Sequence, residues 1–256
     1  MTVAALRARV APVLDENLKR IRERIHASAA RAGRDSAAIT LVGVTKTVAP
    51  KVIQQAISFG LADIGENRVQ EAEVKRQELD AWLRAQGSGF GVTAPSPQPS
   101  TQSVLKLRWH LIGHLQKNKA KRAVELFDVV HSVDSGELIR NLERHAADEA
   151  KKLPVFIQVN VSGEAAKFGC KPEGASALAD TIRSSGHLQL AGLMTVPPYA
   201  DNPQANRIHF EQLRLLRDKL GPQLKLSMGM SHDFEAAIEE GADIVRIGTA
   251  IFGSRS

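Results

Sequence analysis

The sequence predicts an α/β protein, a single (β/α)8 barrel of the TIM type with an N-terminal amphipathic helix. Segments with strand and helix character alternate from residue 39 to residue 247, as in parallel sheets with crossover helices. Eight strands follow one another in one unbroken series, which favours a closed barrel over an open sheet. A chain of 256 residues with 43% hydrophobic content can bury one large core. We therefore expect residues 1–256 to form one domain.

The first element is an amphipathic helix over 4–32, because apolar residues recur in it at spacings of three and four, namely Leu14, Leu18, Ile21 and Ile25. Strands are expected at 39–45, 61–64, 107–111, 128–131, 154–160, 188–193, 223–227 and 242–247. The helices between them are expected at 50–59, 67–85, 117–126, 135–151, 172–185, 202–219 and 232–240. Only nine residues follow the last strand, too few for a normal outer helix. We expect the N-terminal helix to cover that gap.

One segment interrupts the alternation. Residues Gly87 to Ser103 are rich in Gly, Ser, Pro, Gln and Thr and have no periodicity. This composition indicates a flexible surface insertion and not a domain linker. A functional lid is the alternative interpretation.

The composition bears on which molecules the protein can bind. The net charge is +6, which suits phosphorylated small molecules and nucleic acids equally and does not choose between them. Tyr and Trp are scarce, with one and two residues, so basic segments lack the interleaved aromatic residues of base stacking. Cys170 is the only cysteine, so no intrachain disulfide is possible, as in a reducing cytoplasm. The N-terminus lacks a signal peptide pattern, and no stretch approaches the roughly 20 apolar residues of a membrane span. We expect a cytoplasmic monomer with no nucleic-acid or membrane partner.

Lys46 is the most informative residue, because it directly follows an apolar strand. A lysine in this position is poorly placed for a solvated charge and well placed to attack an aldehyde as a free amine. The alternative is a strand-end lysine whose side chain extends to water.

Two short glycine-bearing segments, Ser227–Ser231 and Arg246–Thr249, follow the seventh and eighth strands. Barrels often bind phosphate with these two loops, and a helix that begins at Ser231 would offer its N-terminal amides to an anion. An amine nucleophile beside a phosphate site indicates pyridoxal 5'-phosphate (PLP).

Other polar residues also follow strands and are expected at the same mouth of the barrel, Asn67 and Thr195 among them. Helix capping explains Asn67 and Ser231 equally well. Arg246 is expected to point toward the mouth, with an ion pair to Asp243 as the alternative. If Arg246 meets a pyridine nitrogen, no acid protonates that nitrogen and the ring is a weak electron sink.

His110 and His114 have the spacing of a helical zinc pair, but Gly113 interrupts the pattern and the flanking glutamate is absent. We expect no metal site, and assign His110 to core packing or to cofactor-edge contacts. The basic run Lys117 to Arg122 is interpreted as a solvated helix start.

The motifs together resemble the pyridoxal-phosphate homeostasis proteins, the YggS/PROSC family. The resemblance spans nearly the whole chain, apart from the longer 87–103 insertion. The segments that carry it are Val44–Thr47, Gly65–Glu71, Trp109–Lys119, Val159–Ser162, Gly192–Val196, Leu226–Ser231 and Val245–Gly253.

This resemblance implies a protein that carries or buffers PLP, supports vitamin B6 and amino-acid homeostasis, and has PLP-dependent apoenzymes as candidate recipients. It implies a Schiff base on Lys46 and a pyridine nitrogen facing Arg246. It further implies contacts near the ring from Asn67 and Met194. The phosphate contacts that it implies come from Ser231, Gly248 and Thr249, with Ser227 and Met230 close by.

Two enzymatic alternatives remain open at this point. The family resembles the barrel domain of alanine racemase and of bacterial-type decarboxylases, so one alternative is an amino-acid racemase or related PLP enzyme with Lys46 as base. Those enzymes add a second β-domain, which we expect this chain to lack because it ends directly after strand eight. The other is a phosphosugar enzyme in which Lys46 forms the Schiff base. If Lys46 is not the attachment point for PLP, Lys119 and Lys167 are the next candidates.

Overall fold

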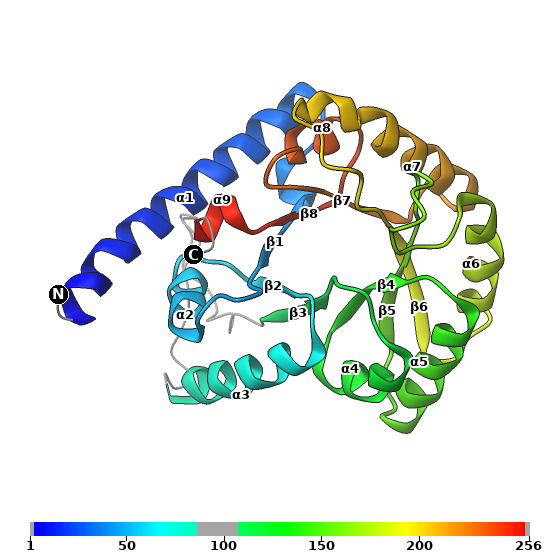
Figure 1. Cartoon of the computed structure of the whole chain (residues 1–256), viewed down its shortest axis with the longest axis horizontal. Coiled ribbons are helices and arrows are strands. Elements are labelled where there is room, and N and C mark those ends of the chain that lie inside the picture. The colour runs from blue at the N-terminus through cyan, green and yellow to red at the C-terminus, as the bar shows by residue number, and fades with distance from the viewer. Residues whose placement is uncertain (1–2, 86–106, 254–256) are drawn as a thin grey trace, which may run out of the picture.

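The structure is a computed structural model that describes residues 3–85 and 107–253, and this part of the chain forms a closed barrel (Figure 1). Each of its eight parallel strands pairs with its neighbours in the chain, and β8 pairs with β1. The predicted (β/α)8 barrel is confirmed. The strands are β1 Thr40–Val44, β2 Asp63–Glu66, β3 Arg108–Leu111, β4 Val129–Val133, β5 Leu153–Gln158, β6 Leu188–Met194, β7 Lys225–Met230 and β8 Ile244–Ile247.

Helices surround the strands, and in three places a 3-10 turn replaces the predicted first turn of a helix. These turns are η3 Lys117–Lys119, η4 Pro172–Gly174 and η5 Pro203–Asn206, and a further one, η1 Ser36–Ala38, was not predicted. The helices are α1 Val3–Arg31, α2 Pro50–Ser58, α3 Val69–Ala85, α4 Ala120–Leu126, α5 Gly136–Asp148, α6 Ala175–Arg183, α7 Arg207–Leu220, α8 Phe234–Glu239 and α9 Thr249–Phe252.

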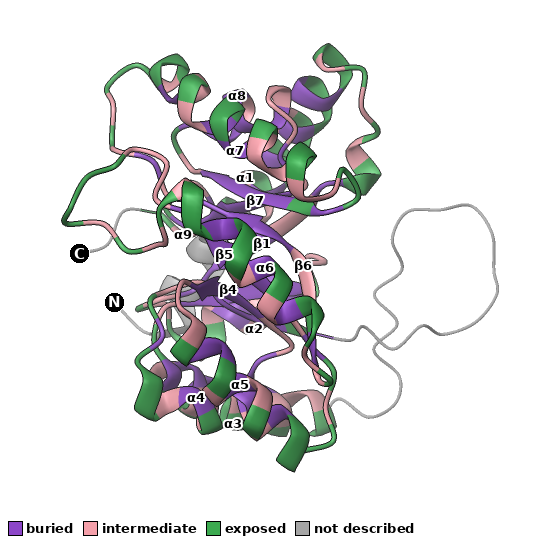
Figure 2. Cartoon of the chain, turned by 90° about the vertical axis from the view of Figure 1, so that its right-hand side faces the viewer, coloured by how far each residue is buried: buried purple, intermediate pink, exposed green. Residues whose placement is uncertain are grey.

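The main core lies between the strands and the helices. Figure 2 shows the strands as largely buried, while exposed residues occupy the outer faces of the helices. A second, smaller group of apolar side chains, Val42, Phe156, Met194 and Ile244, forms a separate cluster. The buried His131 ring stacks on Phe156 of this cluster.

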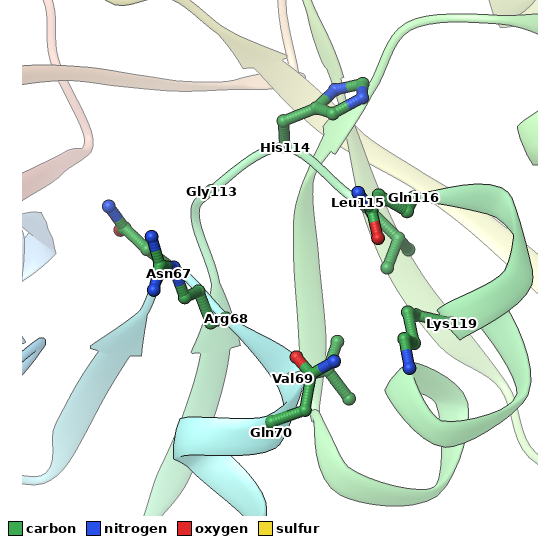
Figure 3. A pocket seen from close by; sticks show the side chains of 9 residues that line it. All are labelled: Asn67, Arg68, Val69, Gln70, Gly113, His114, Leu115, Gln116 and Lys119. Carbon is green, nitrogen blue, oxygen red and sulfur yellow. The ribbon is translucent and has the colours of Figure 1, made fainter.

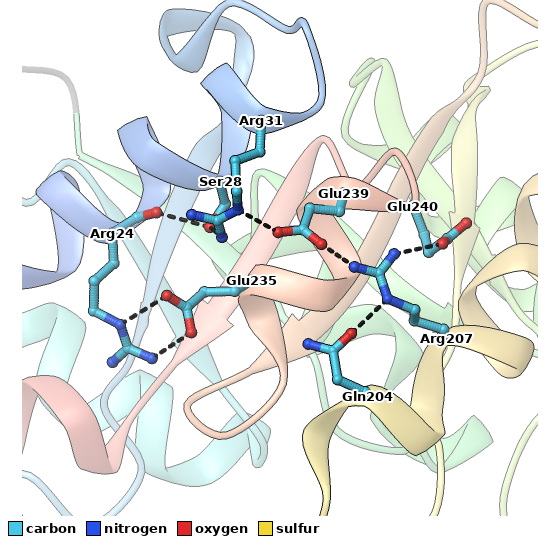
Figure 4. Close-up of polar contacts among 8 residues, drawn as sticks. All are labelled: Arg24, Ser28, Arg31, Gln204, Arg207, Glu235, Glu239 and Glu240. Atoms are coloured by element: carbon cyan, nitrogen blue, oxygen red, sulfur yellow. Dashed lines mark hydrogen bonds and ion pairs between the residues drawn. The ribbon is translucent and has the colours of Figure 1, made fainter.

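Helix α1 covers the side of the barrel where the final outer helix would lie, as predicted. Its apolar residues, Leu18 and Ile21 among them, are buried, and it packs on α2, α8 and α9. Ion pairs join it to its neighbours (Figure 4): Arg31 Nε lies 2.7 Å from Glu239 of α8. Glu239 also pairs with Arg207 of α7. Exposed ion pairs contribute about 0–1 kcal/mol each, so the apolar face supplies most of the stabilisation.

Two predicted boundaries are wrong in a way that affects the site. Strand β7 continues to Met230, so Ser227 lies inside the strand and not in the following loop. Helix α8 begins at Phe234, because Asp233 Oδ1 accepts the Met230 amide at 2.7 Å and holds a turn before it. Ser231 is therefore not the helix cap.

The predicted insertion Gly87 to Ser103 lies outside the described residues. Over residues 3–85 and 107–253, no helix combines the length and apolar character needed to cross a membrane.

Candidate cofactor-binding site

Lys46 lies two residues after the end of β1, at the carboxyl end of the barrel, and is half-buried. The next residue, Thr47, has a φ of +63°, a left-handed conformation that is uncommon for a residue other than glycine. Such a backbone conformation is retained only where surrounding contacts hold it.

Those contacts come from a buried group of charges on β2 and α3. The Lys75 ammonium lies 2.7 Å from Glu66 Oε1 and 2.6 Å from Glu71 Oε1, and it donates to the carbonyl oxygen of Thr45 at 2.5 Å. The Thr45 hydroxyl also donates to Glu66 Oε1, at 2.6 Å, and the Thr47 amide donates to Glu71 Oε1. We call Glu66, Glu71 and Lys75 the ionic clamp.

Burial shapes the charges of the clamp. It raises the pKa of Glu66, although hydrogen bonds from Lys75 and Thr45 oppose the rise. Burial alone would also raise the pKa of Glu71, but the hydrogen bonds from Lys75 and from the Thr47 amide outweigh it and lower that pKa. Glu66 Oε2 is buried and accepts no hydrogen bond from the described part of the chain.

Arg246 lies inside the barrel, on β8, and is 3% exposed. Its guanidinium donates to Ser227 Oγ at 2.7 Å and to the carbonyl oxygen of Thr195 at 2.8 Å. No carboxylate of the described residues lies within ion-pair distance of it, and Asp243 pairs with Arg34 instead. Burial lowers the pKa of Arg246 to about 10, which still leaves it charged at neutral pH.

A chain of buried hydrogen bonds continues from Ser227 through the barrel. His131 Nδ1 lies 2.9 Å from Ser227 Oγ, and its Nε2 lies 2.9 Å from His110 Nδ1. His110 Nε2 lies 2.8 Å from Asp63 Oδ1, and Arg108 also pairs with Asp63. We call Asp63, His110, His131 and Ser227 the histidine chain.

Burial, together with the charge of Arg246, lowers the pKa of His131 far below its usual value, so His131 is neutral. With His131 neutral, one arrangement satisfies each member of the histidine chain. In it the Ser227 hydroxyl donates to His131, His131 donates to His110, and His110 donates to the carboxylate of Asp63.

The third part of the site is a set of hydrogen-bond donors after β7 and β8. Ser231 Oγ accepts from the backbone amides of Gly248 at 3.2 Å and Ala250 at 3.3 Å. Gly229 allows the chain to turn there: its φ is +90°, and a Cβ on it would lie 2.6 Å from the Cβ of Ala237. Thr249 is exposed beside these amides, and Met230 is the last residue of β7.

Asn67 and Met194 lie in different surroundings. Met194 is fully buried at the end of β6, beside Phe156 in the smaller apolar cluster. Asn67 lines a groove of about 600 Å³ (Figure 3). Gly113 belongs to the same groove, and a Cβ on it would lie only 2.3 Å from the Asn67 carbonyl oxygen, so the loops after β2 and β3 touch there.

The structure separates the two histidines of the zinc-like pattern. His110 is buried in the histidine chain, whereas His114 is exposed and stacks on Phe168 with ring centroids 3.9 Å apart. Of the alternative lysines, Lys119 lines the groove of Asn67, and Lys167 pairs with Glu164 at 3.1 Å.

Sequence reasoning gave no role to the clamp residues Glu71 and Lys75 or to the chain residues Asp63 and His131. Signals for both groups exist. Glu71 and Lys75 have the i,i+4 spacing of a helical ion pair. Asp63 begins the short strand β2, and His131 lies in the middle of the short strand β4, each beside apolar residues.

Comparisons with known proteins show the family to which this chain belongs. A family model described as the N-terminal domain of alanine racemase matches residues 14–256. The pyridoxal phosphate homeostasis protein of Aquifex aeolicus is 40% identical over 245 residues, covering 94% of this chain and 97% of that protein. Its namesake from Pseudomonas aeruginosa is 41% identical over 241 residues, covering 94% of this chain and 95% of that protein. This chain belongs to the pyridoxal phosphate homeostasis protein family.

A solved structure extends the comparison to three dimensions. PipY of Synechococcus elongatus, determined with PLP bound, is 31% identical to this chain and superposes with a TM-score of 0.74. The match covers 94% of this chain and 100% of PipY. This chain therefore shares its architecture with PipY over almost its whole length.

Proposed function

We propose that this protein binds PLP through a Schiff base on Lys46 and carries or buffers it, as a cytoplasmic monomer, for PLP-dependent apoenzymes. One observation carries the proposal. Strand β8 pairs with β1 so that Ile247 lies opposite Gly43, which brings Gly248 to the same rim as Lys46. The amine and the phosphate donors thus come from adjacent strands, and relatives that share this architecture are named for PLP homeostasis.

The residues at this rim fit a phosphorylated aldehyde. The amides of Gly248 and Ala250 both donate to Ser231 Oγ, so these polar groups lie together at one place on the rim, where a phosphate group could accept from them. Thr249 adds a hydroxyl beside them, and Ser227 and Met230 lie on the strand that leads to Ser231. When bound, PLP supplies an aldehyde for Schiff-base formation and an electron-withdrawing ring.

The chemistry of attachment requires a neutral amine. The Lys46 amine adds to the aldehyde carbon and a C=N bond forms. The carbonyl oxygen leaves as water with the two amine protons. Half-burial of Lys46 limits the access of bulk water to this linkage.

Arg246 supports a carrier in preference to an enzyme. We assign its guanidinium to the side of the pyridine nitrogen, with Asn67 and Met194 near the ring. A guanidinium only donates hydrogen bonds and stays protonated, so it does not give the pyridine nitrogen the proton that an acidic residue would share. Without that proton the ring withdraws electrons weakly, which disfavours reactions through a carbanion.

The predicted phosphate contacts can be tested by comparing PLP with pyridoxal, which lacks the phosphate. Hydrogen bonds to charged groups contribute roughly 1.5–3 kcal/mol each, so pyridoxal without phosphate should bind far more weakly than PLP. Titrations followed by the visible absorbance of the Schiff base measure both affinities. Ser231→Ala should weaken PLP binding but not pyridoxal binding, and Ser162→Ala, in the loop after β5, is the matched control. Equal affinities for the two aldehydes would contradict the proposal.

A further inference from the structure

The two residues that flank Lys46 are both held by the ionic clamp. Thr45, before it, offers its carbonyl oxygen to Lys75 and its hydroxyl to Glu66. Thr47, after it, donates its amide to Glu71. We infer that Glu71 and Lys75, with Glu66, are positioning residues that set the backbone of Lys46 for Schiff-base formation. The inference rests on the proposed function.

The donors of Lys75 are fully engaged in this arrangement. Its ammonium has three protons and three acceptors, one on each of Glu66, Glu71 and Thr45. The side chains of Lys75 and Glu66 are 7% and 0% exposed, so the bonds form away from bulk water. These three bonds hold Glu66, Glu71 and the Thr45 carbonyl group around one ammonium.

The left-handed backbone at Thr47 is the feature that needs the clamp. A threonine with a φ of +63° is strained, and the bond from its amide to Glu71 offsets that strain. Without the Glu71 acceptor the residue can relax to an extended or helical conformation. Such a change rotates the peptide that follows Lys46 and redirects its amine.

A half-buried lysine with a merely structural role is present for comparison. Lys151 donates to the carbonyl oxygens of Val124 and Phe127, both at 2.6 Å, at the end of the barrel where strand β4 begins. That lysine holds backbone too, but it has no connection to the loop of Lys46. The clamp differs in that every backbone group it holds belongs to a neighbour of Lys46.

The test compares variants on helix α3 that differ in their distance from the loop. Glu71→Ala removes the acceptor for Thr47, and because the Glu71 side chain is 27% exposed the fold should tolerate the change. Glu71→Gln keeps an acceptor oxygen. Glu73→Ala is the matched control, since Glu73 lies on the same helix, is 35% exposed and pairs with Arg122 at 2.6 Å. Lys75→Met is a fourth, more disruptive variant.

Two measurements distinguish an effect on the position of the Lys46 amine from an effect on the binding of the phosphorylated ligand. The first is the rate of Schiff-base formation with PLP, followed by visible absorbance, with borohydride reduction and peptide mapping to identify the lysine. The second is the affinity for pyridoxine 5'-phosphate, an alcohol that has the phosphate but no aldehyde. We expect Glu71→Ala to slow the reaction at Lys46 by about tenfold or more, as for a displaced reacting group. Its affinity for pyridoxine 5'-phosphate should stay at the wild-type value.

Glu71→Gln should recover most of the lost rate, Glu73→Ala should react like the wild type, and Lys75→Met should be slower than Glu71→Ala. Equal rates for Glu71→Ala and Glu73→Ala would overturn the inference and leave the proposed function intact. A parallel loss of pyridoxine 5'-phosphate affinity in Glu71→Ala would also overturn it, because the clamp would then support the whole site. Failure of the wild type to react at Lys46 would overturn both.

Discussion

Arg246 shows how single residues set the chemistry of this site. A buried guanidinium without a carboxylate is costly unless its donors are used, and here Ser227 and the Thr195 carbonyl accept from it. Ser227 is held in turn by His131, which stacks on Phe156 with ring centroids 4.4 Å apart. The charged guanidinium of Arg246 is therefore held in one position by two neutral hydrogen-bond acceptors in a buried site.

The neutral state of His131 predicts a pH dependence of stability. Its pKa in the folded protein lies far below 6.5, so below about pH 6.5 the unfolded chain takes up a proton that the folded protein refuses. Stability should therefore fall as the pH falls through this range. His131→Gln should reduce the slope by up to about 1.4 kcal/mol per pH unit, the value for one proton. Urea unfolding between about pH 7.5 and 5.5 measures the slope.

The exposed His26 on α1 provides the control for that experiment. His26→Gln should leave the slope close to that of the wild type. If His131→Gln and the wild type lose stability equally on acidification, His131 is not held neutral in the folded protein.

At the scale of single residues, the sequence was a good guide to which residues belong to the candidate site. It was a poorer guide to the position of their side chains in the barrel. Ser227 and Arg246 were expected at the mouth, but both lie within strands and are buried in the barrel. The predicted strand 223–227 stopped at Ser227, whereas β7 continues to Met230, and the sequence pattern did not show that the side chains of Ser227 and Arg246 are buried. The hydrogen bond between Arg246 and Ser227 could not be predicted either, because the two residues come close together only when the barrel closes.

At the scale of elements, helix α1 takes the place of an outer barrel helix. Its contacts with α8 and α9 join the two ends of the chain, and its ion pairs with Glu235 and Glu239 lie along α8 (Figure 4). The alternation of strand and helix patterns correctly predicted this order. It could not predict the 3-10 turns or the start of α8, which depend on local hydrogen bonds such as that of Asp233.

The packing of α1 predicts a clear stability difference between two positions on one helix. Leu18 is fully buried, so Leu18→Ala should lower the free energy of unfolding by about 2–5 kcal/mol. Val13 is 54% exposed, so Val13→Ala should change it by less than about 0.5 kcal/mol. Denaturant unfolding measures both values, and similar losses at the two positions would show that α1 does not seal the barrel.

At the scale of the whole molecule, closure of the barrel creates the candidate site. Lys46 and Gly248 are far apart in the sequence, and the pairing of β1 with β8 brings them to the same rim of the barrel. The sequence predicted this meeting because eight strands in series imply closure. The ionic clamp could not be predicted in the same way, since it depends on how α3 lies across the β1 loop.

The charged, immobile Arg246 predicts little turnover of amino acids. Each 1.36 kcal/mol of lost carbanion stabilisation slows a reaction tenfold. The lone Tyr199 is 79% exposed and stacks on His232, so it is not enclosed with the site as an acid–base group would be. Chiral chromatography and exchange of the α-proton followed by NMR, with L-alanine and other L-amino acids, measure turnover. Rates typical of enzymes, on the order of 1–10³ per second, would restore the racemase alternative.

The most direct test of the account is to locate the lysine that holds PLP. The protein is incubated with PLP, reduced with borohydride and digested, and the modified peptide is identified by mass spectrometry. We predict that the label lies on Lys46, and that Lys46→Ala loses both the label at that position and the visible absorbance band. A label on Lys119 or Lys167 with an unchanged spectrum in Lys46→Ala would contradict the central claim.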